Sequence, residues 1–351
     1  MSVGDSVLVG NLSYLAIGRE ITYGTYSTCT AGVAFMSLSM KALKDTKILE
    51  EIQTNRTNSH FVQLGKVVEG DAEMVYSPRN LGINYLLHNA FGGGPVTTAT
   101  ATGATAGAAA FQHQIDIANF QTTYSSLCFN VRKGQATTGK IFEYSGIRVN
   151  ELSLKAEIDE ALMMSCSLIA KDCTITSNDV SAVLDTTTAT QTPLSFVSGR
   201  FSVETTPAGL TSTSSWSVQS FEFKIMNNLN SDAAARRIGS DVLQVLPAGL
   251  AQFALTASLR FDTTTAFDAM MAGTRLAAEL MFEGATLPGS NIRESIKITM
   301  PYVMVSDAGD PELASAQDPL TSEVTFAVLR DPTASGYAVR AVVVNDTTSY
   351  A

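Results

Sequence analysis

The chain has 351 residues, of which 45% are hydrophobic and 16% are charged, and its net charge of −10 gives a sequence pI near 4.8. Soluble domains usually carry about 25% charged residues, so this composition predicts a surface that either has few charges or is largely buried against partners. Sequence-independent binding of nucleic acid requires clusters of Lys and Arg that contact phosphates, and their absence here excludes a general nucleic-acid-binding protein.

The N-terminal segment and the cysteines predict a protein made in the cytosol. The first residues lack a basic start and include Asp5, so they do not form a secretory signal. No apolar run approaches the roughly 18 residues that a membrane span requires, so no membrane association is expected. Four cysteines, Cys29, Cys128, Cys166 and Cys173, show no C-x-x-C spacing, which favours buried thiols over disulfides or a zinc site.

Apolar and polar residues alternate with a period of two in many segments, which predicts half-buried strands. In chain order these segments are 34–40, 70–76, 148–154, 164–169, 216–225, 253–261, 295–300, 323–329 and 337–344. Short helices are expected at two places. One begins at Ser77-Pro78 and stops at 92–94, and the other runs from Asp262 to Gly273. The fold class is therefore mainly β.

One order of elements occurs twice along the chain. An alternating strand, a polar loop of some twenty residues (41–64 and then 226–246), a second strand, a short helix and several further strands follow one another in each half. This repetition predicts a first domain over 1–175, a Thr-rich linker over 176–193 and a second domain over 194–351. The low-complexity segment 95–110 has few large side chains, so we expect an exposed, mobile loop there.

The sequence contains no recognisable catalytic or cofactor-binding motif. It lacks the nucleophile elbow, the zinc-protease helix and the phosphate-binding loop, and the glycines at 92–94 end a helix instead of opening one. His60, His88 and His113 lie on different segments without an acidic or thiol partner nearby. We therefore predict no enzyme activity, no metal and no cofactor.

Taken together, these segments resemble a phage tail tube protein. The resemblance rests on stretches in both halves: 20–24 (EITYG), 70–81 (GDAEMVYSPRNL), 85–87 (YLL), 145–150 (SGIRVN), 221–229 (FEFKIMNNL), 237–240 (RIGS) and the strand–helix unit 250–273. It covers nearly the whole chain. Residues 95–110 fit nothing expected of the core of this family.

The resemblance implies two β-sandwich or barrel domains of the tail-tube type, each with one short flanking α-helix. In this family six domains close a ring whose sheets join around a lumen, and a long loop reaches the adjoining ring. Two domains in one chain imply trimeric, pseudo-hexameric rings that stack into a tube, with DNA as a non-specific passing cargo. The inter-ring contacts are expected in the two long loops, at Asn55, Arg56, Asn58, Asn227, Asn228, Arg236 and Arg237.

Further expectations concern location and partners. The resemblance implies a place in the virion tail, assembly in the host cytoplasm, and contact with a tape-measure protein and a tail terminator. The acidic surplus is expected to line the lumen, where it would repel DNA phosphates. Other self-assembling structural proteins remain alternatives: a capsid-decorating protein, a baseplate protein, or a cell-surface fibre, adhesin or pilus subunit.

Overall fold

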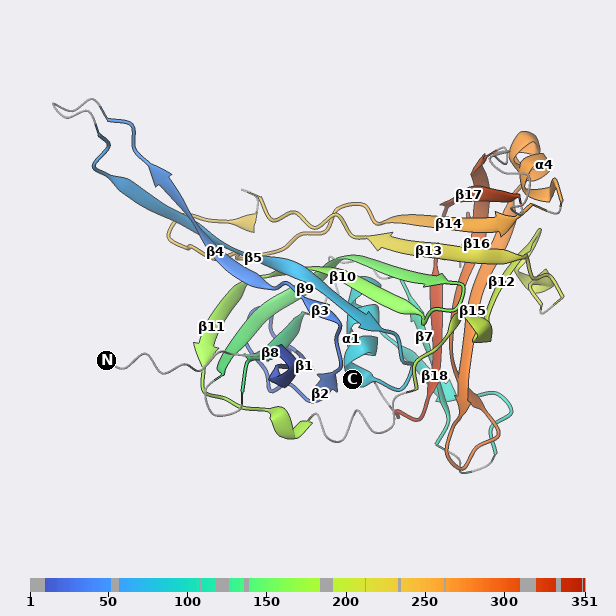
Figure 1. Ribbon diagram of the computed structural model, residues 1–351, viewed down its shortest axis with the longest axis horizontal. Helices are drawn as coiled ribbons and strands as arrows, with labels where there is room; N and C mark the ends of the chain where they lie inside the picture. Colours follow the sequence, from blue (N-terminus) through green and yellow to red (C-terminus); the bar gives the residue numbers. More distant parts are fainter. Residues whose placement is uncertain are drawn as a thin grey trace.

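The computed structural model describes residues 10–51, 57–105, 107, 109–117, 126–135, 139–183, 192–211, 213–232, 235–261, 263–309, 320–332, 336–348 and 350. The described chain is built mostly of antiparallel β-strands, and each half contributes one α-helix (Figure 1). The predicted fold class, mainly β with a short helix in each half, is confirmed.

The described part of the first half carries eleven strands and one helix. The strands are β1 (Tyr14–Arg19), β2 (Ala31–Val33), β3 (Ser37–Leu38), β4 (Lys41–Ile48), β5 (Phe61–Val75), β6 (Thr97–Thr100), β7 (Phe111–Asp116), β8 (Leu127–Lys133), β9 (Lys140–Glu157), β10 (Met163–Ala170) and β11 (Asp172–Thr176). The helix is α1 (Leu81–Ala90).

The second half carries the remaining strands and the second helix. The strands are β12 (Gly199–Glu204), β13 (Val218–Met226), β14 (Gln252–Arg260), β15 (Leu276–Thr286), β16 (Arg293–Ala308), β17 (Thr321–Val328) and β18 (Arg340–Asn345), and the helix is α4 (Thr265–Ala272). Short 3₁₀ turns lie at Gly10–Leu12, Ser181–Val183, Phe196–Ser198 and Pro207–Gly209.

The strands of the two halves pair in the same order. In the first half the order is β1–β8–β9–β10–β5–β4, with β11 also on β9. In the second half it is β12–β15–β16–β17–β14–β13, with β18 also on β16. α1 follows β5, and α4 follows the counterpart strand β14. The repetition seen in the sequence thus extends to the pairing of the sheets.

A β-bulge occurs at the same place in both halves. In β9 the bulge leaves Asn150 without a pairing partner on β10, and in β16 it leaves Ser306 without one on β17. A bulge bends its strand and increases the local twist. The counterpart strands β9 and β16 therefore bend at equivalent points.

The two halves share one sheet and one core. β13 pairs with residues 151–157 of β9, and β18 pairs with β7. The amide of Asn227 donates to the carbonyl oxygens of Ala90 (3.0 Å) and Val149 (2.9 Å), and so ties the second half to α1 and β9. The predicted domain boundary stays a prediction, and residues 184–191 of the proposed linker lie outside the described part of the chain.

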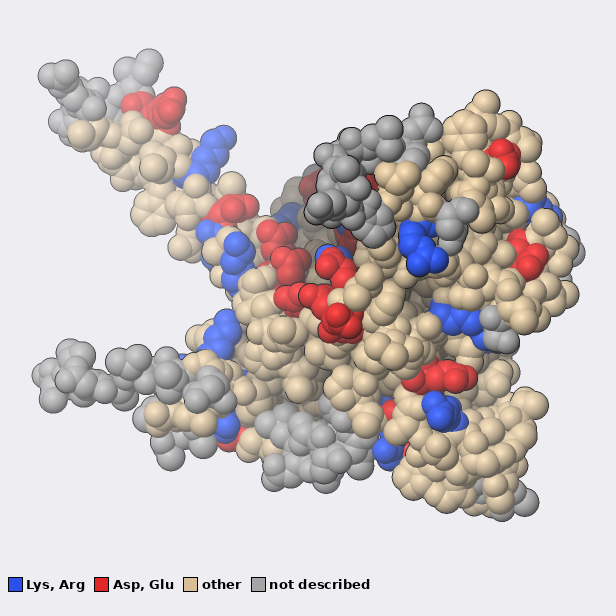
Figure 2. Space-filling model, turned by 45° about the vertical axis from the view of Figure 1, so that its right-hand side comes forward, with Lys and Arg blue, Asp and Glu red and all other residues tan. Residues whose placement is uncertain are grey.

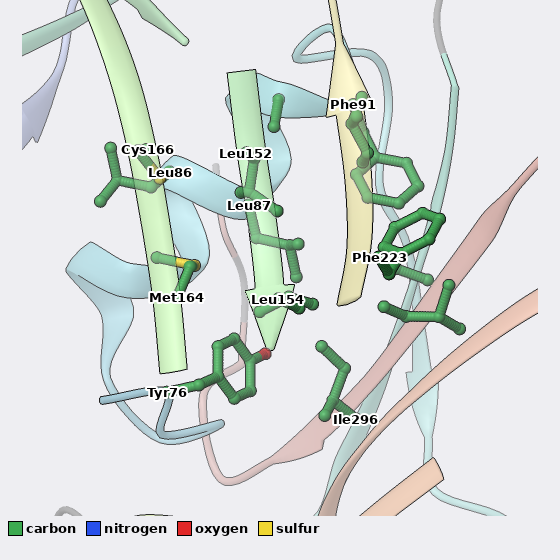
Figure 3. Packing of buried hydrophobic residues seen from close by; sticks show 14 of the residues in the cluster. Tyr76, Leu86, Leu87, Phe91, Leu152, Leu154, Met164, Cys166, Phe223 and Ile296 are labelled. Atoms are coloured by element: carbon green, nitrogen blue, oxygen red, sulfur yellow. The ribbon is translucent and has the colours of Figure 1, made fainter. Parts of the chain in front are cut away.

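α1 lies inside the molecule, against the shared sheet (Figure 3). Leu86 lies beside Cys166 of β10, Leu87 beside Leu152 of β9, and Phe91 beside Phe223 of the second half; all are fully buried. Burying one such side chain stabilises a fold by roughly 1.5–3 kcal/mol. The helix therefore helps to hold the two halves together.

α1 begins at Leu81 and not at the predicted Ser77-Pro78. The side-chain oxygen of Asn80 accepts from the backbone N–H of Ile83 at 3.1 Å, which makes Asn80 the N-cap. Pro78 lies in the preceding turn, where its carbonyl accepts from the side chain of Asn84. α4 ends at Gly273 (φ 60°), as the sequence predicts.

Two of the predicted loops are wrong. Residues 41–64 do not form a polar loop: β4 and the first part of β5 make a long hairpin, whose apolar residues are spread among Lys, Asp and Thr. The described residues of 95–110 are largely exposed, as predicted, but they include β6, which pairs with β7, and Ala101 and Ala110 are buried against Leu287. Small side chains suffice there because they pack against a larger one. The other long connection, 226–246, is irregular beyond β13, as predicted.

Candidate assembly surfaces

One face of the shared sheet is packed and the other is open. Alternate residues of the strands β5–β10–β9–β13–β14–β17–β16 point into the core, as Leu152, Phe223 and Leu255 do. Their chain neighbours point to the opposite side because a strand is pleated, and these neighbours are half-buried or exposed. We call this second side the open face.

The open face is predominantly acidic. Its acidic residues are Glu69, Asp71 and Glu73 of β5, Glu151 and Glu157 of β9, Glu222 of β13, Asp307 of β16 and Glu323 of β17. Its basic residues include Lys41, Arg260 and Lys297, together with Lys155 and Lys224, which pair with Glu157 (2.5 Å) and Glu222 (3.1 Å) on their own strands. The remaining acids give the face a negative surplus.

Small polar side chains fill most of the positions between these charges. They are Ser153, Ser165, Ser167, Ser220, Thr256, Ser258 and Thr325. Figure 2 shows acidic side chains gathered in the middle of the molecule, beside the base of a projecting arm. Such a surface offers little apolar area and few cations, so it is poorly suited to hold a polyanion.

The projecting arm is the β4–β5 hairpin, which extends away from the body (Figure 1). All of β4 and the first residues of β5 are exposed. The arm carries a row of large apolar side chains in this exposed state: Leu43, Ile48, Phe61, Val62 and Leu64. Ile48 and Phe61 pair across the hairpin while Val62 and Leu64 lie on the other face of β5, so the arm exposes apolar side chains on both faces, as surfaces that contact other proteins do.

Among the strand edges that lack a second partner within the described residues, two border the open face. β4 pairs with β5 alone, and at the end of β16 Asp307 and Ala308 pair with β17 alone. Unpaired N–H and C=O groups on such edges can pair with a strand of another chain.

α4 lies at the periphery of the molecule, whereas its counterpart α1 is enclosed (Figure 1). Its side chains Phe267 and Met271 are 38% and 71% exposed. A cavity of about 550 Å³ lies between α4 and the end of the sheet. Its lining includes Trp216, Phe261, Phe267, Ala308, Ser322 and Val324.

The structure separates the predicted contact residues. Asn55 and Arg56 lie outside the described residues, while Asn58 is exposed on the arm side of β5 and Arg237 is exposed on the second connection. Asn228 is exposed, and its amide donates to the carbonyl of Leu250. These exposed positions are free to meet another ring, and their inter-ring role stays a prediction.

Two of the predicted contact residues have structural roles within the chain. Asn227 is fully buried and bonds to α1 and β9, so it is unavailable to another ring; this part of the prediction is corrected. Arg236 is half-buried and donates to the carbonyl oxygens of Lys66 and Asp241. It fixes the second connection to the base of the arm.

The described residues hold no cluster of His, Cys, Asp and Glu that fits a metal ion. His88 is buried and bonds to the carbonyl of Gly94, and burial lowers its pKa to about 4. Cys29 and Cys128 are buried thiols whose Sγ atoms lie 3.8 Å apart. None of the described helices is long and apolar enough to cross a membrane.

The model of one protein family, described as phage tail tube protein, matches residues 10–328 of the chain. The chain belongs to the phage tail tube protein family. It is accordingly a structural component of the phage tail and not an enzyme. The match spans both halves, and both contain the repeated strand pairing.

Comparison with individual proteins finds matches among solved structures. No curated protein sequence matches the chain. Of the solved structures, 14 chains match, among them one titled "Crystal structure of Hcp protein", at 14% identity and a TM-score of 0.25. That similarity covers 42% of this chain and 98% of the other.

Sequence reasoning missed the arm and the open face. The alternation Glu69-x-Asp71-x-Glu73 is a signal for the open face, because it places acids on one side of a strand opposite the buried Val68, Ala72 and Met74. The free edges had no sequence signal, since an edge depends on which strands meet in the fold.

Proposed function

We propose that this tail tube protein assembles into rings of three chains, which stack into a tube through which DNA passes. The observation that carries the proposal is the repeated pairing order, β1–β8–β9–β10–β5–β4 and β12–β15–β16–β17–β14–β13. Two equivalent units in one chain supply a ring of six units from three chains. Closed rings satisfy strand edges without open-ended growth in the ring plane.

The open face lines the lumen in this arrangement. It runs across both halves on one side of the shared sheet, and its acidic surplus and small polar side chains would repel DNA phosphates. Repulsion between like charges that lie within about 10 Å of each other is only partly screened at physiological salt. DNA would therefore pass without sticking to the wall.

The β4–β5 arm forms the main contact between stacked rings. Its exposed apolar side chains need cover, and stacking buries them head to tail. Asn58 and the exposed residues Asn228 and Arg237 of the second connection contribute polar contacts. Obligate interfaces of this kind bury on the order of 2,000–5,000 Å².

Other parts of the proposal follow from the family. The tube forms in the host cytoplasm, around a tape-measure protein and beneath a tail terminator.

Electron microscopy of the purified, concentrated protein tests the proposal. We expect hollow rings or striated tubes in negative stain. A monomer that fails to polymerise both on concentration and with a tail initiator complex would overturn the tube and favour a decorating or baseplate protein.

A further inference from the structure

The contact between the two halves of one chain supplies a template for a contact between two chains. Within the chain, β13 pairs on one edge with β14 and on the other with residues 151–157 of β9. In the repeated pairing order, β16 is the counterpart of β9, and the segment of β3 and β4 is the counterpart of β13. Within the described part of the chain, neither counterpart has the corresponding partner.

Strand pairing fixes which residues are equivalent. The bulges at Asn150 and Ser306 align Cys166 of β10 with Val324 of β17. Ala72 of β5 and Ala257 of β14, which pair with these two residues, therefore hold the same place. Leu152 and Ala308 are equivalent in turn, since they pair with the same Cys166 and Val324.

The same reasoning aligns β4 with β13. Ala42 pairs with Val68 and Ile225 pairs with Phe253, and these partners lie equally far before Ala72 and Ala257. Ala42 is therefore equivalent to Ile225. Within the chain, Ile225 pairs with Leu152.

We propose that residues 41–44 of one chain pair antiparallel with residues 306–309 of a second copy, with Ala42 opposite Ala308. The pairing repeats, between chains, the bond between β13 and β9. It rests on the proposed ring, and it states which edges and which register close that ring.

The chemistry of the two edges is complementary. In this register Leu43 lies opposite Asp307, and Lys41 lies diagonally from the same carboxylate on the open face. Diagonal neighbours are about 7–8 Å apart, within reach of a lysine side chain. Within the chain, Lys224 and Glu151 stand in the equivalent diagonal relation.

The shared bulge supports the same pairing. The carbonyl of Asn150, the bulged residue of β9, accepts from the backbone N–H of Asn227 at 2.8 Å, just after β13. Ser306 is the bulged residue of β16. Its exposed position leaves the equivalent carbonyl ready for the backbone of Lys44 from the second copy.

The cavity beside α4 marks the space that the second copy covers. Its wall residues Phe261, Ala308, Ser322 and Val324 are equivalent to Tyr76, Leu152, Met164 and Cys166, which are labelled in Figure 3. In the first half this region is a filled core that Phe223 and Ile296 of the second half complete (Figure 3). In the second half the equivalent partners are absent from the described chain.

Disulfide trapping tests the register. The variant Ala42→Cys/Ala308→Cys is assembled into tubes and oxidised mildly, and we expect a ladder of covalent dimers and trimers on a non-reducing gel. Opposed residues on antiparallel strands have Cβ atoms about 4.5–5.5 Å apart, close enough for a disulfide after a small shift. The two single variants measure the background from the native cysteines.

The variant Ala42→Cys/Asp307→Cys is the matched control. Its two side chains point to opposite faces of the sheet, so it should yield at least tenfold less cross-linked product. Tubes that form and cross-link equally well in both variants, or only in the control, would overturn the register and leave the tube intact. Failure of the wild-type protein to form any tube would instead overturn the proposed function.

Hydrogen exchange gives a second measurement that needs no variant. Amides of residues 41–44 and 306–309 should exchange at least tenfold more slowly in tubes than in the monomer, because pairing protects them. Unchanged exchange at both segments in well-formed tubes would contradict the proposed pairing.

Discussion

At the scale of single residues, buried polar groups join the elements of this protein. Asn227 bonds α1 and β9 to the second half, and Asn80 caps α1. A buried polar group left without its partner costs about 1–3 kcal/mol. These amides thus fix one arrangement of the two halves, which apolar packing alone would leave freer to slide.

His88 makes the stability of the monomer depend on pH. Burial lowers its pKa to about 4, compared with about 6.5 in the unfolded chain, and the charge of Arg19 acts in the same direction. Between these values the unfolded chain binds more protons, so stability is complete above pH 6.5 and falls as the pH decreases towards 4. The free energy of unfolding, measured with urea, should include a loss of about 2 kcal/mol from His88 between pH 7.5 and pH 5.

Two variants separate this contribution from others. His88→Gln should lose most of the pH slope, and a smaller slope should remain because burial also lowers the pKa of His113. His113→Gln should lose only that smaller part of the slope. A His88→Gln variant with the full slope would contradict the assignment.

At the scale of elements, the arm and the open face have different roles in the proposed assembly. In the proposed tube the arm presents apolar side chains to another copy, while the open face presents acids to the lumen. Both belong to the same sheet, and β5 contributes its first residues to the arm and its last to the open face. The length of one strand therefore couples stacking to the lining of the lumen.

Polar substitutions on the arm should block stacking and spare the fold. Ile48 and Phe61 are paired across the hairpin and are 61% and 63% exposed. The free energy of unfolding of the variant Ile48→Ser/Phe61→Ser should lie within about 0.5 kcal/mol of the wild-type value. The variant should nevertheless form few or no tubes by electron microscopy. Val197→Ser, at an exposed apolar position away from the arm, is the matched control. Normal tubes from the arm variant would remove the arm from the stacking contact.

Reversing charges on the open face should slow the passage of DNA. Glu151→Lys, Glu222→Lys and Glu323→Lys replace repelling carboxylates by cations that bind phosphate. Phages that carry these changes should assemble tails and eject DNA several times more slowly, with the delay shrinking as salt increases. Glu283→Lys, on β15 outside the open face, should eject normally. Unaltered ejection from all three variants would contradict a lumen-facing role.

The sequence predicted elements better than it predicted their environment. Alternation located β10, β13, β16 and β17, and a Gly after the apolar run located the end of α4. The sequence pattern predicted a loop for the arm because the apolar residues of its hairpin are exposed and do not alternate against a core. The burial of Asn227 depends on the meeting of β9 and β13, which lie far apart in the sequence and show no local pattern.

At the scale of the whole molecule, the proposed ring takes one chain as two tube units because the pairing order repeats. Around the proposed ring, the pairing of β9 with β13 within each chain alternates with the pairing of β4 and β16 between neighbouring chains. A ring closed in this way has no unpaired edge in its plane. It grows only along its axis, which is the property that a tube requires.

The number of chains per ring tests this account most directly. Cryo-electron microscopy of assembled tubes, with the mass per unit length measured independently, gives both the symmetry and the stoichiometry. We predict threefold rings with three chains each and approximate sixfold symmetry at low resolution. Rings of six chains would preserve the tube but contradict the equivalence of the two halves on which the account depends.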